Sequence, residues 1–193
     1  MVFTVLMVVF TIIAYVRLIR LLLQEEDSGV RPNIASWFTW LAVDVSLLAA
    51  SMYAGAVREG IIFGIFAFGS FSVISLLFQK GEIKLSVLDQ ASLVVSFTAL
   101  VAWIATNDPK IAVYLNVVVL TVASIPTLIQ TIFQPELEDN RVWGYFFLGG
   151  LTNLLAVESW DMLHVFPAFT VLATQFVFFG FSSIGRLNKG LSW

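Results

Sequence analysis

The sequence predicts an all-α membrane protein with seven transmembrane helices. Seven apolar stretches fill almost the whole of the 193-residue chain, in which 59% of the residues are hydrophobic and only 12% are charged. Each stretch has the roughly 20 residues needed to cross a hydrocarbon layer about 30 Å thick. The stretches cover residues 2–23, 32–54, 60–79, 87–106, 109–133, 141–159 and 162–185. Their connections are too short for a soluble domain, so we expect any function to lie in the bundle or its loops.

The first stretch has no basic residue ahead of it, so we expect it to remain as a helix rather than to be cleaved as a signal peptide. The basic residues also predict the orientation, because cytoplasmic loops carry an excess of Lys and Arg. One face would hold eight of them: Arg17, Arg20, Arg31, Lys80, Lys84, Arg141, Arg186 and Lys189. The other face would hold only Arg58 and Lys110. This split predicts an external N-terminus and a cytoplasmic C-terminus.

Asp44 is the most informative residue of the second stretch. It lies near the expected bilayer midplane, whereas nearly all other charges lie at the ends of stretches. A charge at that depth is costly, so we expect the side chain to face the bundle interior and either pair or stay protonated. At helical spacing Trp37, Trp40, Asp44 and Ser51 share about one face. Two interpretations remain open: a substrate or proton site, or a structural hydrogen bond to a neighbouring helix.

The later stretches carry small and polar residues. Gly60 and Gly64 in the third stretch have a spacing that lets helices pack closely. Asn116, Asn153 and Gln175 place amides within the fifth, sixth and seventh stretches. Each amide either lines a pocket or joins two helices by a hydrogen bond, which contributes about 0.6 kcal/mol on average in membrane proteins.

A weak internal repeat relates the two halves of the chain. Trp37 and Trp143 are 106 residues apart, and Tyr53 and Trp160 are 107 apart, so about one register relates both pairs. The repeat predicts two three-helix units joined by a single linker helix. Because equivalent helices then run in the same direction, the units are parallel repeats related by an axis along the membrane normal. The predicted parts are residues 1–80, 81–108 and 109–193.

Several classes of function are excluded or disfavoured by composition. The chain has no cysteine and one histidine, so disulfides, thiol catalysis and Cys or His metal clusters are excluded. We expect no enzyme activity and no cofactor, since no nucleophile, base and metal cluster converge. A retinal protein needs a lysine in the last span, and residues 162–185 contain none. The net charge of −3 indicates no nucleic-acid partner.

Two segments resemble a known family. Residues 31–40 (RPNIASWFTW) resemble the start of the second helix of uncharacterised bacterial PQ-loop-like membrane proteins. Residues 124–127 (SIPT), 134–136 (QPE) and then Trp143 resemble their second repeat. The three-plus-one-plus-three plan is similar to that of the SWEET and PQ-loop superfamily of sugar and amino-acid transporters. The resemblance implies a SWEET-like bundle and a transport function.

The resemblance also implies roles for particular residues. Pro126 matches the proline that kinks the fifth helix and would act as a hinge. Tyr53 and Trp160 match the aromatic residues that line a central pocket, late in the second helix of each unit. Ser70 and Gln175 stand in the regions where the family has its pocket asparagines. The matching part of the first helix has no proline, so the family's rocking mechanism is implied for one half only.

These observations lead to one hypothesis and its alternatives. We expect a facilitator of a small polar solute, sugar-like or another metabolite, that works by alternating access in a bacterial inner membrane. The candidate binding residues are Asp44, Tyr53, Ser70, Asn116, Asn153, Trp160 and Gln175, and Pro126 is the candidate hinge. The alternatives are a transporter of the nicotinamide-riboside type and a non-transporting receptor or assembly protein of the PQ-loop-like fold. The small-residue faces permit a homo-oligomer without requiring one.

Overall fold

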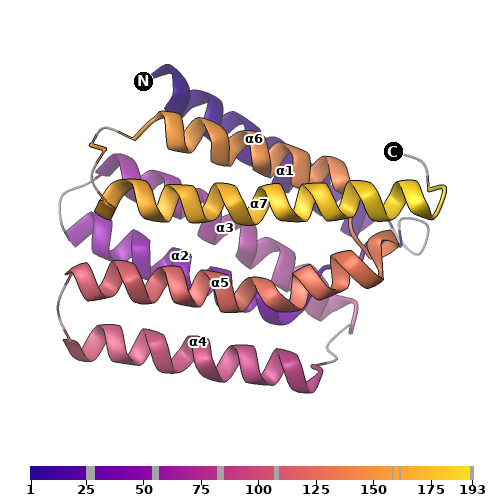
Figure 1. Cartoon of the computed structure of the whole chain (residues 1–193), viewed down its shortest axis with the longest axis horizontal. Helices are drawn as coiled ribbons and strands as arrows, with labels where there is room; N and C mark the ends of the chain where they lie inside the picture. The colour runs from indigo at the N-terminus through magenta and orange to yellow at the C-terminus, as the bar shows by residue number, and fades with distance from the viewer. Residues whose placement is uncertain are drawn as a thin grey trace.

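The computed structural model describes residues 1–24, 29–53, 57–81, 85–106, 109–157, 159–160 and 162–191. Within these residues the chain forms seven α-helices and one short 3-10 helix, and no strand (Figure 1). The elements are α1 (Val2–Leu23), α2 (Ile34–Tyr53), α3 (Val57–Gln79), α4 (Val87–Thr106), α5 (Pro109–Phe133), η2 (Pro135–Leu137), α6 (Asn140–Leu155) and α7 (Met162–Asn188). The predicted helices are therefore all present. The sixth ends at Leu155 rather than at residue 159, and the seventh continues to Asn188 rather than ending at residue 185.

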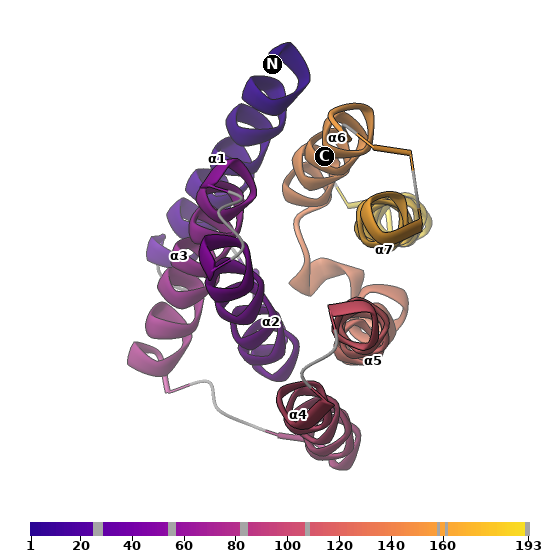
Figure 2. The same ribbon diagram turned by 90° about the vertical axis from the view of Figure 1, so that its left-hand side faces the viewer.

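The helices form two groups of three that face each other (Figure 2). In the first group α3 packs against both α1 and α2, and in the second α7 packs against both α5 and α6. The groups meet where α1 packs against α6 and where α2 packs against α5. The remaining helix, α4, packs on α5 and α2 at one edge of the bundle. The start of α1 and the end of α7 lie at opposite ends of the bundle (Figure 1).

Several helices are long and apolar enough to cross a membrane. Over the described residues these are four segments: Val2–Leu23, Ile61–Gln79, Tyr114–Phe133 and Val165–Asn188. Large apolar side chains such as Phe68, Phe97 and Phe133 are exposed on the outside of the bundle. An apolar surface of this kind is stable against lipid rather than against water. The fold is consistent with a helical membrane protein.

The helices α2 and α6 begin in the same way. The side chain of Asn33 accepts a hydrogen bond of 3.0 Å from the Ser36 amide, just before α2. Asp139 is the N-cap of α6, and its side chain accepts from the Val142 amide at 2.9 Å. Both caps satisfy amide groups that the first helical turn leaves without partners. Each cap precedes a buried tryptophan by four residues, Trp37 in one helix and Trp143 in the other.

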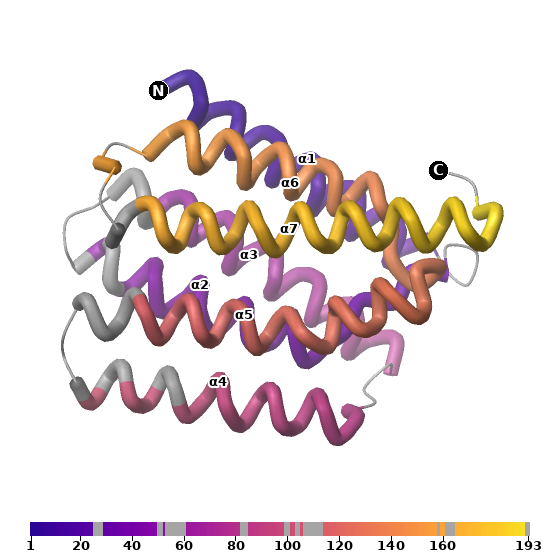
Figure 3. The backbone as a smooth tube through the Cα atoms, viewed as in Figure 1, coloured from indigo at the N-terminus to yellow at the C-terminus, as the bar shows by residue number. Residues whose placement is uncertain are grey.

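The chain between the end of α5 and the start of α6, which includes η2, lies at one end of the bundle (Figure 3). Polar contacts join the two groups there. The guanidinium of Arg17 in α1 binds both carboxylate oxygens of Asp139 in α6, at 2.8 and 2.7 Å. The backbone amide of Arg31 donates to the Leu137 carbonyl at 2.8 Å. Beside them, Lys189 at the end of α7 pairs with Glu136 at 2.6 Å. The first group is thus held to the second by an ion pair and by a backbone hydrogen bond.

Pro126 lies inside α5 and is buried. Proline has no amide hydrogen, so the Val122 carbonyl, four residues earlier, loses its helical partner. Ser92 of α4 donates its hydroxyl to this carbonyl at 3.4 Å. The linker helix therefore contacts α5 at the point that proline weakens. A second proline, Pro167, lies inside α7, where the sequence reasoning did not single it out.

Candidate functional site

A cavity of about 170 Å³ lies between the two three-helix groups. Residues from α1, α2, α3, α5, α6 and α7 line it, whereas α4 contributes none of the described lining residues. The lining residues are Tyr15, Trp37, Trp40, Val43, Asp44, Leu47, Ile62, Phe63, Phe66, Ser70, Leu120, Ser124, Trp143, Phe146, Asn153, Val171, Thr174, Gln175 and Phe178. An apolar cavity of about 150 Å³ is known to hold one benzene molecule. The space therefore suits one small molecule.

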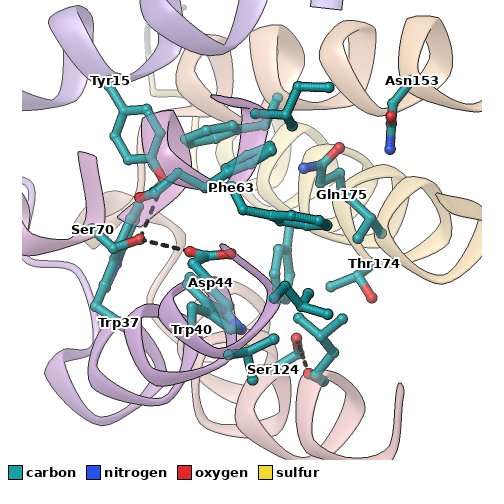
Figure 4. Close-up of a pocket in the computed structure, with 18 of the residues that line it drawn as sticks. Tyr15, Trp37, Trp40, Asp44, Phe63, Ser70, Ser124, Asn153, Thr174 and Gln175 are labelled. Atoms are coloured by element: carbon teal, nitrogen blue, oxygen red, sulfur yellow. Dashed lines mark hydrogen bonds between the residues drawn. The ribbon is translucent and has the colours of Figure 1, made fainter. Parts of the chain in front are cut away.

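One polar side of the cavity is centred on Asp44. Its Oδ2 accepts a hydrogen bond from the Ser70 hydroxyl at 3.4 Å (Figure 4). The Ser70 oxygen also lies 3.2 Å from the Tyr15 hydroxyl, which in turn donates to the Phe66 carbonyl at 3.2 Å. These contacts bring α1, α2 and α3 together around the carboxylate. Among the described residues no basic side chain pairs with Asp44.

The second polar side belongs to α6 and α7. Asn153, Thr174 and Gln175 lie across the cavity from Asp44 (Figure 4). Gln175 is only 9% exposed, and its Oε1 has no hydrogen-bond partner among the described residues. The indole nitrogen of Trp37, on the opposite wall, is also buried and without a partner there. Buried polar atoms are costly to leave unpaired, so both are placed to contact a bound solute or water.

Aromatic rings form a large part of the wall. Trp37 and Trp40 pack edge to face with centroids 5.1 Å apart, and Trp40 lies 6.2 Å from Trp143 across the interface between the groups. Trp143 packs against Phe178 at 4.5 Å. Tyr15 packs edge to face on Phe146 at 5.1 Å. Rings packed in this way restrict each other's rotamers in the conformation described.

Trp143 connects the wall to a buried carboxyl group outside the helices. Its indole nitrogen donates to Glu138 Oε2 at 3.0 Å, and the Gln130 amide donates to Glu138 Oε1 at 2.8 Å. Burial raises the pKa of Glu138 to about 8, although these two hydrogen bonds lower it in part. The charge of the neighbouring Asp139 raises the pKa further. Glu138 is therefore mostly protonated at neutral pH.

The structure brings together four of the residues singled out from the sequence. Asp44, Ser70, Asn153 and Gln175 all line the cavity. This places an acid and two amides in one space. Pro126 lies in α5 but does not line it.

Two other candidates are not among the described lining residues, and a third lies outside the described side chains. Asn116 is buried in α5, only 5% exposed, but is not among the lining residues. Trp160 is 71% exposed, because α6 ends at Leu155 and the tryptophan lies in the connection beyond the helix. The side chain of Tyr53 lies outside the described part of the structure. Of the two expected aromatic walls, Trp160 does not line the cavity, and the role of Tyr53 stays a prediction.

Sequence reasoning missed most of the aromatic lining. Trp37 and Trp40 were recognised as sharing a helix face with Asp44, yet their rings were not assigned to the pocket. That shared face was the available signal. For Tyr15, Phe146 and Phe178 the sequence offers no signal that separates them from lipid-facing aromatic residues.

The arrangement provides groups that can bind a small molecule. It offers a carboxylate, two amides and several ring faces around one small space. Among the described residues, no group of three acidic or histidine side chains could hold a metal ion. The sequence matches no protein-family model, and the searches of curated proteins and of solved structures return no match either.

Proposed function

We propose that this protein is a membrane carrier that binds a small solute in its central cavity and passes it across the bilayer by alternating access. The observation that carries the proposal is the position of the cavity, between two three-helix groups, with polar side chains from both. A carrier of this kind binds its solute near the middle of the membrane, at the interface between its repeats. Asp44, Asn153 and Gln175 are the proposed polar contacts.

The packing of the helices supports a three-plus-one-plus-three repeat. Exchanging α1 with α5, α2 with α6 and α3 with α7 leaves the set of packed pairs among these six helices unchanged. Under this exchange the α1 and α6 contact becomes the α5 and α2 contact, and the third helix of each group stays between the other two. The caps Asn33 and Asp139 fall in the same 106-residue register as Trp37 and Trp143.

In this proposal all seven helices cross the membrane. Besides the long apolar segments, α2 and α4 have 20 residues each, close to the roughly 20 that a span requires. The shorter α6, with 16 residues, is held between α1 and α7. The distribution of basic residues favours a cytoplasmic C-terminus, and the short loops are typical of a bacterial inner-membrane protein.

Alternating access requires one group to move against the other. At the end where η2 lies, the Arg17–Asp139 ion pair and the Arg31–Leu137 backbone bond join the two groups. We propose that this end is the closed cytoplasmic side, and that these contacts separate when the carrier opens inward. Pro126 is the proposed hinge, because α5 lacks one backbone hydrogen bond there.

Counterflow uptake into proteoliposomes tests the proposal. We expect saturable uptake of one member of a panel of labelled amines, amino acids, nucleosides and sugars. Asp44→Asn should reduce it strongly, whereas Trp160→Ala, which changes an exposed ring outside the cavity, should leave it unchanged. Absence of uptake for every solute, with protein shown to be folded and inserted, would instead support a receptor or assembly protein.

A further inference from the structure

We propose that the solute is a small organic cation, an amine or quaternary ammonium ion, whose charge pairs with Asp44 and whose alkyl groups lie against the aromatic wall. This inference rests on the proposed function in one respect, that the central cavity is the solute site. It names the chemical class that the cavity selects.

The charge balance of the cavity is the first argument. Among the described residues that line it, Asp44 is the only acidic residue, and none is basic. The carboxylate has one hydrogen bond, from Ser70 at the long distance of 3.4 Å. A carboxylate inside a bundle normally has a basic partner or several donors, because an unpaired charge away from water is costly. A cationic solute would supply the missing partner.

The aromatic wall is the second argument. Trp37, Trp40 and Trp143 line the same space as Asp44, together with Tyr15 and Phe66. The negative face of an aromatic ring attracts a cation whose centre lies within about 6 Å, and tryptophan does so most strongly. Cages of such rings are a known means of binding quaternary ammonium groups. A carboxylate beside several indole rings therefore binds both the charge and the methyl groups of such an ion.

The scarcity of free hydrogen-bonding groups argues against a sugar. The Ser124 hydroxyl already donates to the Leu120 carbonyl at 2.7 Å, and the Ser70 hydroxyl already binds Asp44 and Tyr15. The free groups are mainly the amides of Asn153 and Gln175 and the indole N–H of Trp37. A sugar would bring many hydroxyl groups, and each one left unpaired reduces affinity. A cation with one polar centre makes no such demand.

The size of the cavity agrees with this class. Its volume of about 170 Å³ is close to the roughly 150 Å³ that holds benzene. Tetramethylammonium, choline and butylammonium are of about this size. Gln175 and Asn153, across the cavity from Asp44, would contact a hydroxyl group at the far end of an ion such as choline (Figure 4).

Binding to the purified protein tests the inference without transport. The probes are tetramethylammonium, choline, butylammonium and 3,3-dimethylbutan-1-ol, which has the shape of choline without its charge. Quenching of tryptophan fluorescence reports occupancy, since three tryptophans line the cavity. We expect at least one cation to bind about ten-fold or more tightly than the neutral alcohol. Asp44→Asn should abolish this preference, and the exposed carboxylate variant Glu136→Gln should keep it.

The outcomes separate this inference from the proposed function. Equal binding of choline and the neutral alcohol, or binding of none of the three cations, overturns the cationic class. Saturable counterflow of a neutral solute, with the same rate in Asp44→Asn as in the wild type, would also overturn the cationic class. In that case the proposal that the protein is a carrier would stand. If Asp44→Asn retains the melting temperature and the neutral-alcohol affinity of the wild type, its loss of cation binding reports the lost charge and not misfolding.

Discussion

The indole nitrogen of Trp143 donates a hydrogen bond of 3.0 Å to Oε2 of Glu138, and so ties the cavity wall to a carboxyl group that is only 3% exposed. Trp143 also packs against Phe178 and Trp40, which belong to other helices. The position of the wall therefore depends on a group that can ionise. Ionisation of Glu138 would place a negative charge in a buried site, where the carboxyl oxygens accept hydrogen bonds from the uncharged Gln130 and Trp143 side chains. The nearby Arg186 guanidinium donates to the Glu138 backbone carbonyl at 3.1 Å.

Stability should fall as the pH rises through the titration of Glu138. Its pKa is about 8 in the folded protein, above the roughly 4.3 of an exposed glutamate, so the folded state holds the proton more tightly than the unfolded state. The contribution of Glu138 to stability is complete at pH values below its pKa in the unfolded protein. It is lost as the pH rises to about 8, the pKa of Glu138 in the folded protein. Within this window the unfolding free energy should fall by up to about 1.4 kcal/mol per pH unit.

Melting temperatures in detergent between about pH 5 and pH 9 measure this effect. The Glu138→Gln variant keeps an uncharged side chain at all pH values, so its profile should be flatter than that of the wild type. Glu136→Gln is the matched control, because Glu136 is exposed and its pKa is lowered, not raised, mainly by the hydrogen bond from Lys189. Identical slopes for the wild type and Glu138→Gln would contradict the assignment.

The helices were predictable because apolar length is a direct signal of a span. The structure has α1, α4 and α5 with the residue bounds expected from the sequence. Asp44 was also predictable as a cavity residue, since an acid in the middle of an apolar stretch has no stable place except the bundle interior. Its shared face with Trp37 and Trp40 indicated part of the wall.

The rest of the site was not predictable, because lipid and the bundle interior are both apolar. Phe146 and Phe178 are buried, whereas Phe68 and Phe97 are exposed, and composition treats all four alike. In a soluble protein hydrophobic periodicity would separate the two faces, but in a membrane that contrast is weak. Trp160 was assigned to the pocket from the family resemblance, but α6 ends at Leu155, and Trp160 is not among the described lining residues.

Asp139 should contribute to stability in two separable ways. It caps α6 through the Val142 amide, and it binds Arg17 of α1. Asp139→Ser can keep the cap but not the ion pair, whereas Asp139→Ala loses both. We expect the alanine variant to be less stable than the serine variant by about 1 kcal/mol, as measured by denaturation in micelles. Equal stability of the two variants would show that the cap contributes nothing.

The contact between Ser92 and Val122 should depend on Pro126. Pro126→Ala restores an amide hydrogen to α5, so it should stabilise the helix, by up to about 3 kcal/mol, and slow transport if the hinge is used. Ser92→Ala should destabilise the wild type by about 0.5–1.5 kcal/mol, since the Val122 carbonyl loses its hydroxyl partner. In the Pro126→Ala background the same change should have little effect. Additive effects in this double-mutant cycle would contradict the relationship.

Gly69 should tolerate no side chain, because the Tyr15 ring lies directly against it. A methyl group at this position would overlap the ring carbons. Gly69→Ala should therefore displace Tyr15, weaken its contact with Ser70 next to Asp44, and cost about 1–3 kcal/mol of stability.

Gly64 in the same helix provides the matched control. A methyl group there meets only the Leu48 side chain at 4.0 Å, an ordinary contact. Gly64→Ala should be neutral or slightly stabilising, since alanine favours a helix over glycine by up to about 1 kcal/mol. The melting temperature and the cation affinity should both fall in Gly69→Ala, and neither should fall in Gly64→Ala.

Adding Tyr15→Val to Gly69→Ala should restore part of the lost stability, because the new methyl group overlaps the tyrosine ring and valine has no ring. If Gly69→Ala is as stable as the wild type without that second change, then Tyr15 does not pack on α3 as described.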